Sequence, residues 1–362
     1  MGTAGGRRCL LNSACANLSA GIRSAHLFRL WGVLYCAGCP FLGNECAGQG
    51  AMKYRQLGKT GWKVSVLGLG ASPLGGAFGP VDEKEALRTV ATALDLGINL
   101  IDVAPFYGST RAETILGKAL KGTSREKYFL ATKVGRYGSS PKDFDYSGAR
   151  VVQSVDESLK RLKLSHIDLI QVHDIEFASF DLLLKETLPA LERLKTTGKV
   201  RHIGLTAFPL EILKKMTSET RIDTVLSYCR YCLTDITLVR LLSHLKTRKI
   251  GVINASPFAM GLLTEKGPPV WHPAPADYRD VCARAIEHCK KRKRDLAKLA
   301  LQFAVSNTDI ATTLVGTSNA KKLRQDVRWI EEPIDEGLLS EVQGVLKPIL
   351  NRSWLGGLEN NA

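Results

Sequence analysis

Short apolar runs alternate with amphipathic stretches between residues 53 and 330, and this rhythm limits the fold more than any other feature. Each of the eight runs is followed by a stretch with helical spacing of apolar residues. The predicted strands are Leu67–Gly70, Asn99–Val103, Tyr128–Val134, His166–His173, Val200–Leu205, Thr224–Tyr228, Gly251–Ser256 and Ile310–Val315. The predicted helices are Asp82–Leu96, Ala112–Leu120, Ala149–Leu162, Phe180–Thr196, Leu210–Met216, Thr237–Lys246, Tyr278–Val305 (a longer helical region) and Ala320–Trp329. Asp82 is expected to cap the first of these helices, with Glu85 at the capping-box position.

The predicted strands do not alternate between apolar and polar residues, which is typical of parallel strands buried on both faces. Eight such units predict an α/β fold, a (β/α)8 TIM barrel. The competing open, doubly wound sheet would carry G-x-G-x-x-G after its first strand. Here that strand is followed by Gly70-Ala-Ser-Pro-Leu-Gly75-Gly76. Two runs that precede it, Lys53–Leu57 and Trp62–Val66, predict an N-terminal β-hairpin, and the residues after the last unit predict a C-terminal loop or helix.

The first 51 residues have a different composition from the rest of the chain. They carry several arginines, and the first acidic residue is Glu45. A mitochondrial transit peptide has this composition, and so does a non-structural extension ahead of an internal start at Met52. We therefore expect an extension over 1–51, a single barrel domain over 52–362, and a cytoplasmic protein unless the extension directs it to mitochondria.

Charge and cysteine content restrict the partners. The net charge is +15, and the densest basic run is Lys290–Arg294. The run is interpreted as a solvated helix end, with a nucleic-acid or nuclear-localisation patch as the alternative. The pairs Cys36/Cys39 and Cys229/Cys232 lack intervening histidines, so the nine cysteines are interpreted as thiols and no metal site is expected. No apolar stretch reaches the length of about 18 residues that a membrane span needs.

Four ionisable residues stand at or near the ends of three consecutive predicted strands: Asp102, Tyr107, Lys133 and His173. In a barrel of this kind, catalytic side chains project from the carboxyl ends of strands. A lysine buried in an apolar strand needs a counter-charge, and Asp102 can supply it. We expect the pair to lower the pKa of the Tyr107 phenol, and His173 to bind a substrate oxygen. Alone, each residue is equally consistent with packing or capping; together they predict acid–base chemistry on a carbonyl or alcohol.

These residues resemble the Asp-Tyr-Lys-His tetrad of the aldo-keto reductases in order, spacing and strand context. The resemblance covers 53–330 and includes Asn254-Ala-Ser-Pro-Phe-Ala-Met-Gly-Leu-Leu263 and Leu314-Val-Gly-Thr-Ser-Asn319. It implies oxidoreduction with NAD or NADP and no metal, with Tyr107 as the proton donor or acceptor.

The resemblance also implies cofactor contacts at Thr206, Ser227, Ser256, Pro257, Phe258, Gly261, Leu263, Gly316, Ser318, Lys322 and Asp326. Two positions depart from the family pattern. Ala207 stands where an asparagine usually holds the nicotinamide amide, and Ser227 is the polar residue nearest to the usual glutamine. Because Gly316–Asn319 carries no basic residue for a 2′-phosphate, NAD is favoured, and Lys321 and Lys322 leave NADP open.

Within the family the chain is similar to the branch of L-galactose and D-arabinose dehydrogenases, through Leu226-Ser-Tyr-Cys-Arg-Tyr231 and His173-Asp-Ile-Glu-Phe177. That branch implies oxidation of an aldose at C1 to a lactone. Phe106, Asp174 and Trp271 are the expected substrate contacts. The alternatives are a broad NADPH-dependent aldehyde and ketone reductase and a channel-associated regulatory subunit with slow chemistry. The expected partner is a small aldose or aldehyde, with no nucleic acid and no membrane, and the chain is expected as a monomer or weak homo-oligomer.

Overall fold

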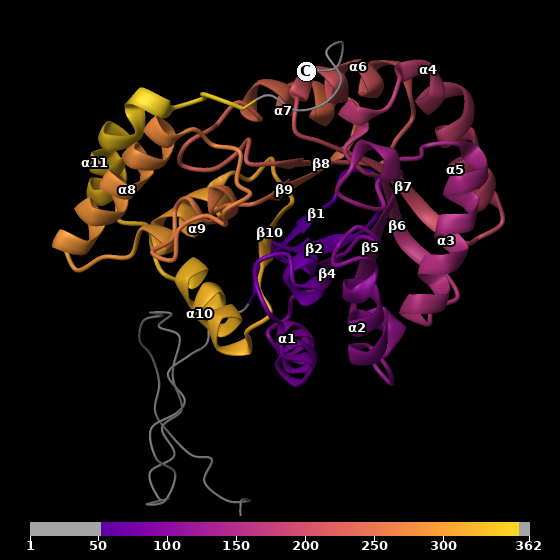
Figure 1. The fold of residues 1–362 in the computed structure, drawn as a ribbon, viewed down its shortest axis with the longest axis horizontal. Helices are drawn as coiled ribbons and strands as arrows, with labels where there is room; N and C mark the ends of the chain where they lie inside the picture. The colour runs from indigo at the N-terminus through magenta and orange to yellow at the C-terminus, as the bar shows by residue number, and fades with distance from the viewer. Residues whose placement is uncertain (1–51, 355–362) are drawn as a thin grey trace, which may run out of the picture. The chain divides into compact units, whose positions relative to one another are not determined.

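The computed structural model describes residues 52–354, and its core is a closed barrel of eight parallel strands (Figure 1). The order around the barrel follows the sequence, and the last strand closes on the first through the register pair Thr313 and Leu67. The predicted (β/α)8 barrel is confirmed. Its strands are β3 (Leu67–Gly70), β4 (Leu100–Asp102), β5 (Phe129–Val134), β6 (Ile167–Val172), β7 (Val200–Ala207), β8 (Thr224–Tyr228), β9 (Gly251–Ala255) and β10 (Thr312–Gly316).

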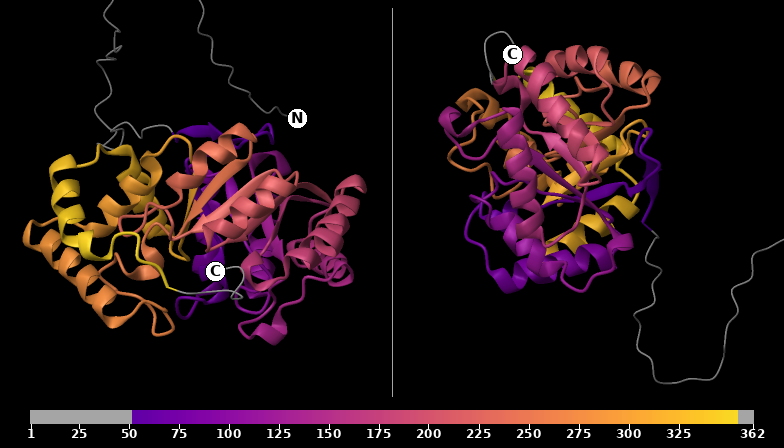
Figure 2. Two further views of the ribbon diagram at one scale, coloured as in Figure 1. Left: turned by 90° about the horizontal axis from the view of Figure 1, so that it is seen from above. Right: turned by 90° about the vertical axis from the view of Figure 1, so that its right-hand side faces the viewer.

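Helices surround these strands on the outside of the barrel (Figure 2). They are α1 (Glu83–Asp95), α2 (Arg111–Ala119), α3 (Gly148–Leu162), α4 (Phe180–Leu182), α5 (Leu188–Thr196), α6 (Leu210–Glu219), α7 (Val239–Thr247), α8 (Ala276–Lys291), α9 (Leu296–Ser306), α10 (Ala320–Glu331) and α11 (Glu336–Leu346). A π-helical turn, Leu183–Thr187, joins α4 to α5. The longer helical region expected over Tyr278–Val305 is divided into α8 and α9. Lys293 has a positive φ, and Asp295 caps a new helix by accepting from the Ala297 N–H at 2.8 Å.

The caps of α1 show one further correction. Asp82 caps the helix as expected and accepts from the Lys84 N–H at 2.8 Å. Glu85, expected to complete a capping box with Asp82, instead accepts from the Ala320 N–H at 2.9 Å. Because Ala320 begins α10, the carboxylate connects the first helix of the barrel to the last.

The predicted hairpin covers the amino-terminal end of the barrel. Strands β1 (Tyr54–Gln56) and β2 (Lys63–Ser65) pair antiparallel. Trp62 stacks on Phe129, the first residue of β5, with ring centroids 4.5 Å apart, and contacts His202 of β7 edge-on. The carboxyl ends of the strands therefore form the mouth at which the candidate catalytic residues gather.

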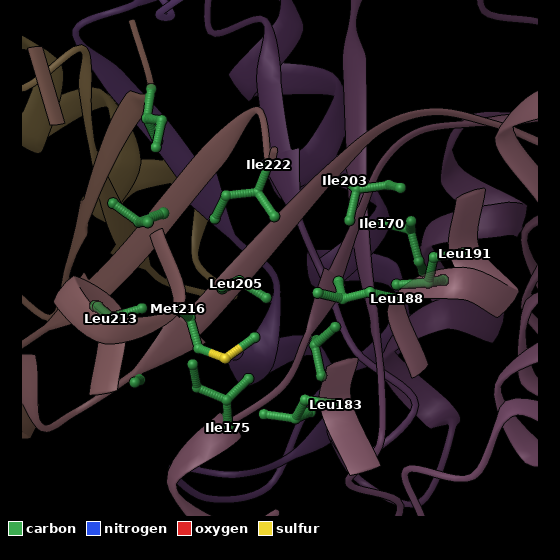
Figure 3. Packing of buried hydrophobic residues seen from close by; sticks show 14 of the residues in the cluster. Ile170, Ile175, Leu183, Leu188, Leu191, Ile203, Leu205, Leu213, Met216 and Ile222 are labelled. Carbon is green, nitrogen blue, oxygen red and sulfur yellow. The ribbon is translucent and has the colours of Figure 1, made fainter. Parts of the chain in front are cut away.

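The core between the barrel and its helices explains why the strands are apolar on both faces. Aliphatic side chains of β6 and β7 pack against those of the π-helical turn, α5 and α6 (Figure 3). Ile170, Ile203, Leu183, Leu191 and Met216 in this cluster are all fully or almost fully buried.

The basic run lies where α8 ends, as interpreted from the sequence. Arg292 pairs with Glu341 at 2.6 Å, and the longer ion pairs Lys290–Glu265 and Arg294–Asp335 flank it. Within 52–354, no helix is long and apolar enough to cross a membrane. The transit-peptide interpretation of residues 1–51 lies outside the described residues.

Candidate active site

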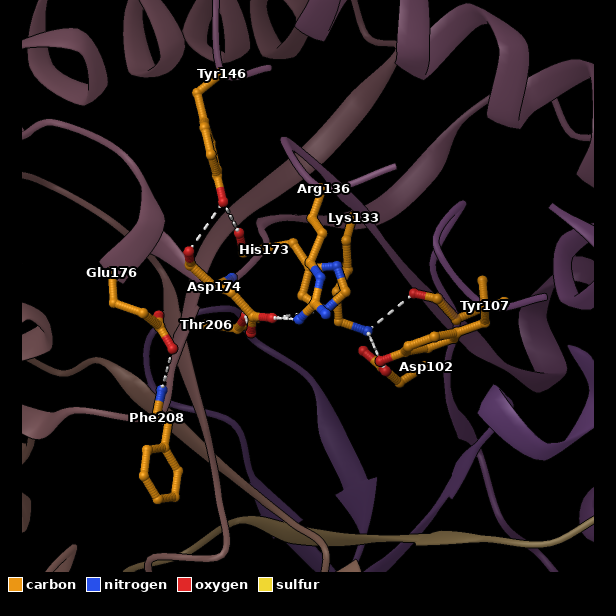
Figure 4. Close-up of polar contacts among 11 residues, drawn as sticks. Asp102, Tyr107, Lys133, Arg136, Tyr146, His173, Asp174, Glu176, Thr206 and Phe208 are labelled. Carbon is orange, nitrogen blue, oxygen red and sulfur yellow. Dashed lines mark hydrogen bonds and ion pairs between the residues drawn. The ribbon is translucent and has the colours of Figure 1, made fainter. Parts of the chain in front are cut away.

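The barrel brings Asp102, Tyr107, Lys133 and His173 together at its mouth (Figure 4). Asp102 ends β4, Lys133 is the penultimate residue of β5, and His173 directly follows β6. Tyr107 lies in the turn after β4, and its ring meets that of His173 edge-on at 5.8 Å between centroids. Consecutive parallel strands thus place the four side chains beside one another, as expected from the sequence.

Lys133 is the centre of the cluster. Its Nζ forms an ion pair with Asp102, donates to the Val103 carbonyl at 3.0 Å, and lies 3.1 Å from the Tyr107 hydroxyl. The side chain is 2% exposed. Burial lowers its pKa, but attraction to Asp102 and Tyr107 outweighs burial, so the Lys133 pKa lies above its usual value. Lys133 is therefore a fixed positive charge beside the phenol.

The expected depression of the Tyr107 pKa is not found in the chain without cofactor. Burial raises the pKa of the phenol above 10, and the nearby Lys133 offsets only part of that shift. At neutral pH the phenol therefore holds its proton, which suits a proton donor to a carbonyl oxygen. In the opposite direction the phenol must first lose that proton.

His173 is a neutral imidazole at physiological pH. Burial lowers its pKa to about 3, with Lys133 and Arg136 acting in the same direction against the attraction of Asp174. Its Nδ1 is buried without a hydrogen-bond partner among the described residues. A neutral ring beside Tyr107 can orient a substrate oxygen by hydrogen bonding without adding a charge.

Sequence reasoning missed Gln171. This residue is the register partner of Lys133 on β6, and its Nε2 donates to the second oxygen of Asp102 at 2.7 Å. Asp102 is thereby held from two sides, by Lys133 and by Gln171. The available signal was a polar residue inside the apolar strand Asp168-Leu-Ile-Gln-Val172.

Asp174, an expected substrate contact, is held on all sides. It adopts the left-handed conformation with φ 49°. Its N–H donates to Thr206 Oγ1 at 2.9 Å, its carbonyl accepts from the Tyr146 hydroxyl at 2.9 Å, and its carboxylate pairs with Arg136. Tyr146 also donates to the His173 carbonyl at 2.8 Å. Tyr146 and Arg136, neither of them predicted, thus fix the backbone and side chain that follow β6.

A residue of the π-helical turn supports Tyr146 in turn. Thr187 Oγ1 donates to the Tyr146 carbonyl at 2.5 Å. The contact joins the helical layer outside the barrel to the loop that holds the catalytic strand end.

The other two expected substrate residues differ in position. Phe106 lies within 6.0 Å of the His173 ring and 5.8 Å of the Tyr107 ring, measured between centroids. Trp271 is 55% exposed and packs on Phe78 at 5.7 Å. Phe106 therefore belongs to the site, whereas Trp271 joins two loops at the rim, where its ring contacts Phe78 and His272.

The C-terminal segment reaches the mouth. The Trp354 ring stacks on Phe208 at 5.2 Å with an interplanar angle of 13°, and it meets His272 and Tyr278 edge-on. Phe208 follows the last residue of β7, so Trp354 lies above the strand next to His173.

Two hydroxyl residues are expected near the nicotinamide, and they differ in whether the hydroxyl already has a hydrogen-bond partner. The Thr206 hydroxyl already accepts from the Asp174 N–H. The Ser227 Oγ, at the end of β8, is fully buried and has no partner within 52–354. An unsatisfied buried hydroxyl costs free energy unless a ligand meets it, so Ser227 fits a carboxamide better than Thr206 does.

The loop after β9 was expected to lie on the cofactor pyrophosphate. Ser256, Ala259, Met260 and Gly261 all have positive φ, so the backbone there turns repeatedly between Pro257 and Gly261. Such turns present backbone N–H groups that suit an anion. Leu263 is fully buried and Phe258 packs into two core clusters, so these two side chains hold the loop in place.

The adenosine-side residues follow β10. Gly316 is exposed at the strand end, Ser318 is half-buried, and the Asn319 side chain caps α10 by accepting from the Lys322 N–H at 2.9 Å. Asp326 is buried in α10, and burial raises its pKa to about 7, partly offset by Lys322. The exposed Gly316 and the half-buried Ser318 therefore lie just before the start of α10, where the adenosine side of a dinucleotide is expected.

The arrangement can transfer a proton to or from an oxygen at the Tyr107 hydroxyl, with Lys133 stabilising the charged form and His173 orienting the oxygen. Within the described part of the chain, no group of histidine, cysteine, aspartate and glutamate residues could hold a metal ion. The chemistry that these residues support is acid–base chemistry at a carbonyl or alcohol.

Comparison with known proteins agrees with this chemistry. The model of the aldo/keto reductase family matches residues 66–347. An L-galactose dehydrogenase of Arabidopsis thaliana is 46% identical over 86% of this chain and 99% of its own length. A D-arabinose 1-dehydrogenase of Saccharomyces cerevisiae is 33% identical over 82% of this chain and 94% of its own length. The solved holo form of an aldo-keto reductase from Bacillus halodurans superposes with a TM-score of 0.68 at 28% identity, covering 86% of this chain and 99% of that one.

Proposed function

The chain belongs to the aldo/keto reductase family, and from that membership we propose that it oxidises C1 of an L-galactose-like aldose to the lactone with NAD. The observation that carries the proposal is the 46% identity to an L-galactose dehydrogenase over nearly the whole length of that protein. The four residues joined at the mouth supply the acid–base groups that the reaction requires.

In the oxidation, the C1 hydroxyl gives its proton to the Tyr107 oxygen, and the C1 hydrogen leaves as hydride while the C1–O bond becomes a carbonyl. A bound nicotinamide supplies the hydride acceptor. Lys133, with its Nζ 3.1 Å from the Tyr107 oxygen, stabilises the phenolate that takes the proton. Asp102 and Gln171 fix Lys133, and the neutral His173 orients the C1 oxygen.

The raised pKa of Tyr107 gives this reaction a pH dependence. Because burial favours the protonated phenol, oxidation is expected to accelerate as pH rises and the phenolate becomes populated. Reduction of an aldehyde by the same site uses the protonated phenol and is expected to prefer neutral pH.

For the cofactor we propose NAD. Ser227 would bind the carboxamide, the loop from Ser256 to Gly261 the pyrophosphate, and the segment from Gly316 to Ser318 the adenosine side. Gly316, Thr317, Ser318 and Asn319 carry no charge for a 2′-phosphate. Lys321 and Lys322, which follow in α10, are the basic groups that would serve NADP.

The test is NADH formation by the full chain, followed by absorbance, with NAD or NADP and a panel of L-galactose, L-fucose and D-arabinose. We expect turnover with NAD that Tyr107→Phe abolishes while cofactor binding, measured by tryptophan fluorescence, persists. Reaction only between NADPH and simple aldehydes would replace the proposal with a general reductase. Cofactor binding without any turnover would favour a regulatory subunit.

A further inference from the structure

Arg136 lies directly beside the catalytic cluster, although the acid–base steps do not use it. It follows β5 by two residues, and its Nη1 pairs with the carboxylate of Asp174. In Figure 4 the Arg136 side chain descends between Lys133 and His173 toward Asp174. The Arg136 side chain is 21% exposed, whereas the Asp174 side chain is 4% exposed, so the arginine is the more accessible half of the pair.

Three aromatic rings hold the guanidinium in place. Its central carbon lies 4.1 Å from the Phe106 centroid, 5.1 Å from that of Phe144 and 5.9 Å from that of Phe177. Cations on aromatic faces are attracted to the rings and lose freedom to rotate. The planar group thus keeps one edge on Asp174, while its Nε–H is buried without a partner among the described residues.

Asp174 is fixed relative to the reacting oxygen. Its Oδ2 lies 3.8 Å from Nε2 of His173, the residue expected to orient the C1 oxygen. Thr206 and Tyr146 hold the backbone on either side of this carboxylate. A hydrogen-bond acceptor and an arginine therefore lie beside the imidazole that is expected to orient the C1 oxygen.

We propose that the Arg136–Asp174 pair binds the hydroxyl on the carbon next to C1, so that the site selects aldoses carrying a 2-hydroxyl. The proposal rests on the proposed function and names its specificity determinant. The 2-hydroxyl donates to Asp174 and accepts from the guanidinium. The two oxygens of a vicinal diol then bind side by side, one to His173 and Tyr107 and the other to the ion pair.

The energetics favour a binding role over a purely structural one. A buried ion pair adds little net stability compared with well-packed apolar residues. A site with buried polar groups directed at a substrate hydroxyl strongly rejects the analogue that lacks it, because those groups are left without a partner. The unpartnered Arg136 Nε–H and the left-handed backbone of Asp174 are costs that binding a diol would offset.

The experiment compares each aldose with its 2-deoxy counterpart: L-galactose with 2-deoxy-L-galactose, and D-arabinose with 2-deoxy-D-ribose. For the full-length protein we expect kcat/KM to favour the hydroxylated sugar by at least about 100-fold. In Arg136→Met the ratio should fall toward one, mainly because the hydroxylated sugar is used less well. Asp174→Asn should act in the same way, since asparagine tolerates the left-handed conformation.

Controls separate this outcome from misfolding. Both variants should keep a cooperative unfolding transition and the wild-type Kd for NAD, although breaking the buried pair should lower the melting temperature. Arg136→Lys should recover part of the ratio because it keeps the charge. Equal use of both sugars by the wild type would overturn the inference while leaving aldose oxidation intact. A ratio unchanged in both variants would overturn it as well. No turnover of any aldose would overturn the proposed function and with it this inference.

Discussion

Replacing Asp102 by asparagine tests the role assigned to the buried ion pair. Lys133 and Asp102 side chains are 2% and 5% exposed, so water screens neither charge. Asparagine keeps the shape of the carboxylate and still offers an oxygen to Gln171. The substitution leaves Lys133 buried without its counter-charge, and breaking a buried pair in this way costs about 3–5 kcal/mol.

The cost should depend on pH with a predictable sign. In the wild type the Lys133 pKa lies above its usual value because Asp102 and Tyr107 outweigh burial. Its contribution to stability is therefore full below the unfolded pKa and is lost as pH rises through the raised pKa of the folded state. In Asp102→Asn, burial dominates and the pKa falls below the unfolded value of about 10.4. The unfolded state then binds more protons, and stability rises with pH by up to about 1.4 kcal/mol per unit.

Urea denaturation followed by tryptophan fluorescence, repeated between pH 7 and pH 10, measures both quantities. The difference in free energy of unfolding between wild type and Asp102→Asn should be largest at pH 7 and shrink toward pH 10. The double variant Asp102→Asn with Lys133→Met serves as the control, because it removes both charges and should show a pH-independent difference. A difference that stays constant or widens with pH in the single variant would refute the reasoning.

Three further outcomes are expected. His173 should produce no ionisation between pH 5 and 8 in the kcat/KM profile, because its pKa is about 3; a break near 6.5 that disappears in His173→Asn would contradict this. Because the Trp354 ring stacks on Phe208, Trp354→Ala should lower the free energy of unfolding by about 0.5–1.5 kcal/mol more than the loss of buried area alone would. Trp354→Phe should lie closer to wild type. Equal losses in the two variants would argue against stacking. Arg55 donates to the carbonyls of Val305, Asn307 and Ile310 at 2.7–2.8 Å. Arg55→Met should therefore lower the free energy of unfolding, measured by urea denaturation, by about 1.5–3 kcal/mol. An unchanged denaturation midpoint would count against these hydrogen bonds.

Much of the fold was predictable because each βα unit repeats the same local pattern. A buried parallel strand must be apolar, and a covering helix must be amphipathic. The sequence therefore shows this pair of patterns eight times. The break between α8 and α9 was indicated only by the basic run Lys290–Arg294, because Lys293 carries no sequence sign of its positive φ and the apolar spacing continues on both sides.

The site was predictable where residues project from strand ends and less so where loops close on it. Asp102, Lys133 and His173 follow from strand order alone. Gln171 could have been found as the polar residue whose register partner is Lys133. Arg136 and Tyr146 belong to a loop whose path no local pattern specifies, and their contacts with Asp174 depend on tertiary structure. The hydrogen bond from the Asp174 N–H to the Thr206 hydroxyl could not be predicted either, because it depends on how the ends of two strands meet.

The π-helical turn between α4 and α5 constrains how this chain can change length. A π-helical turn contains one residue more than the α-helical turn it replaces. Deleting a single residue from Leu183–Thr187 would restore a regular helix but rotate everything before or after it by about 100°. Thr187 would then leave the Tyr146 carbonyl, to which it now donates at 2.5 Å. A deletion of one residue outside the barrel would cost little in helix propensity, but it would remove a contact that supports Tyr146 and, through it, the backbone beside His173. The length of this helix is therefore coupled to the active site.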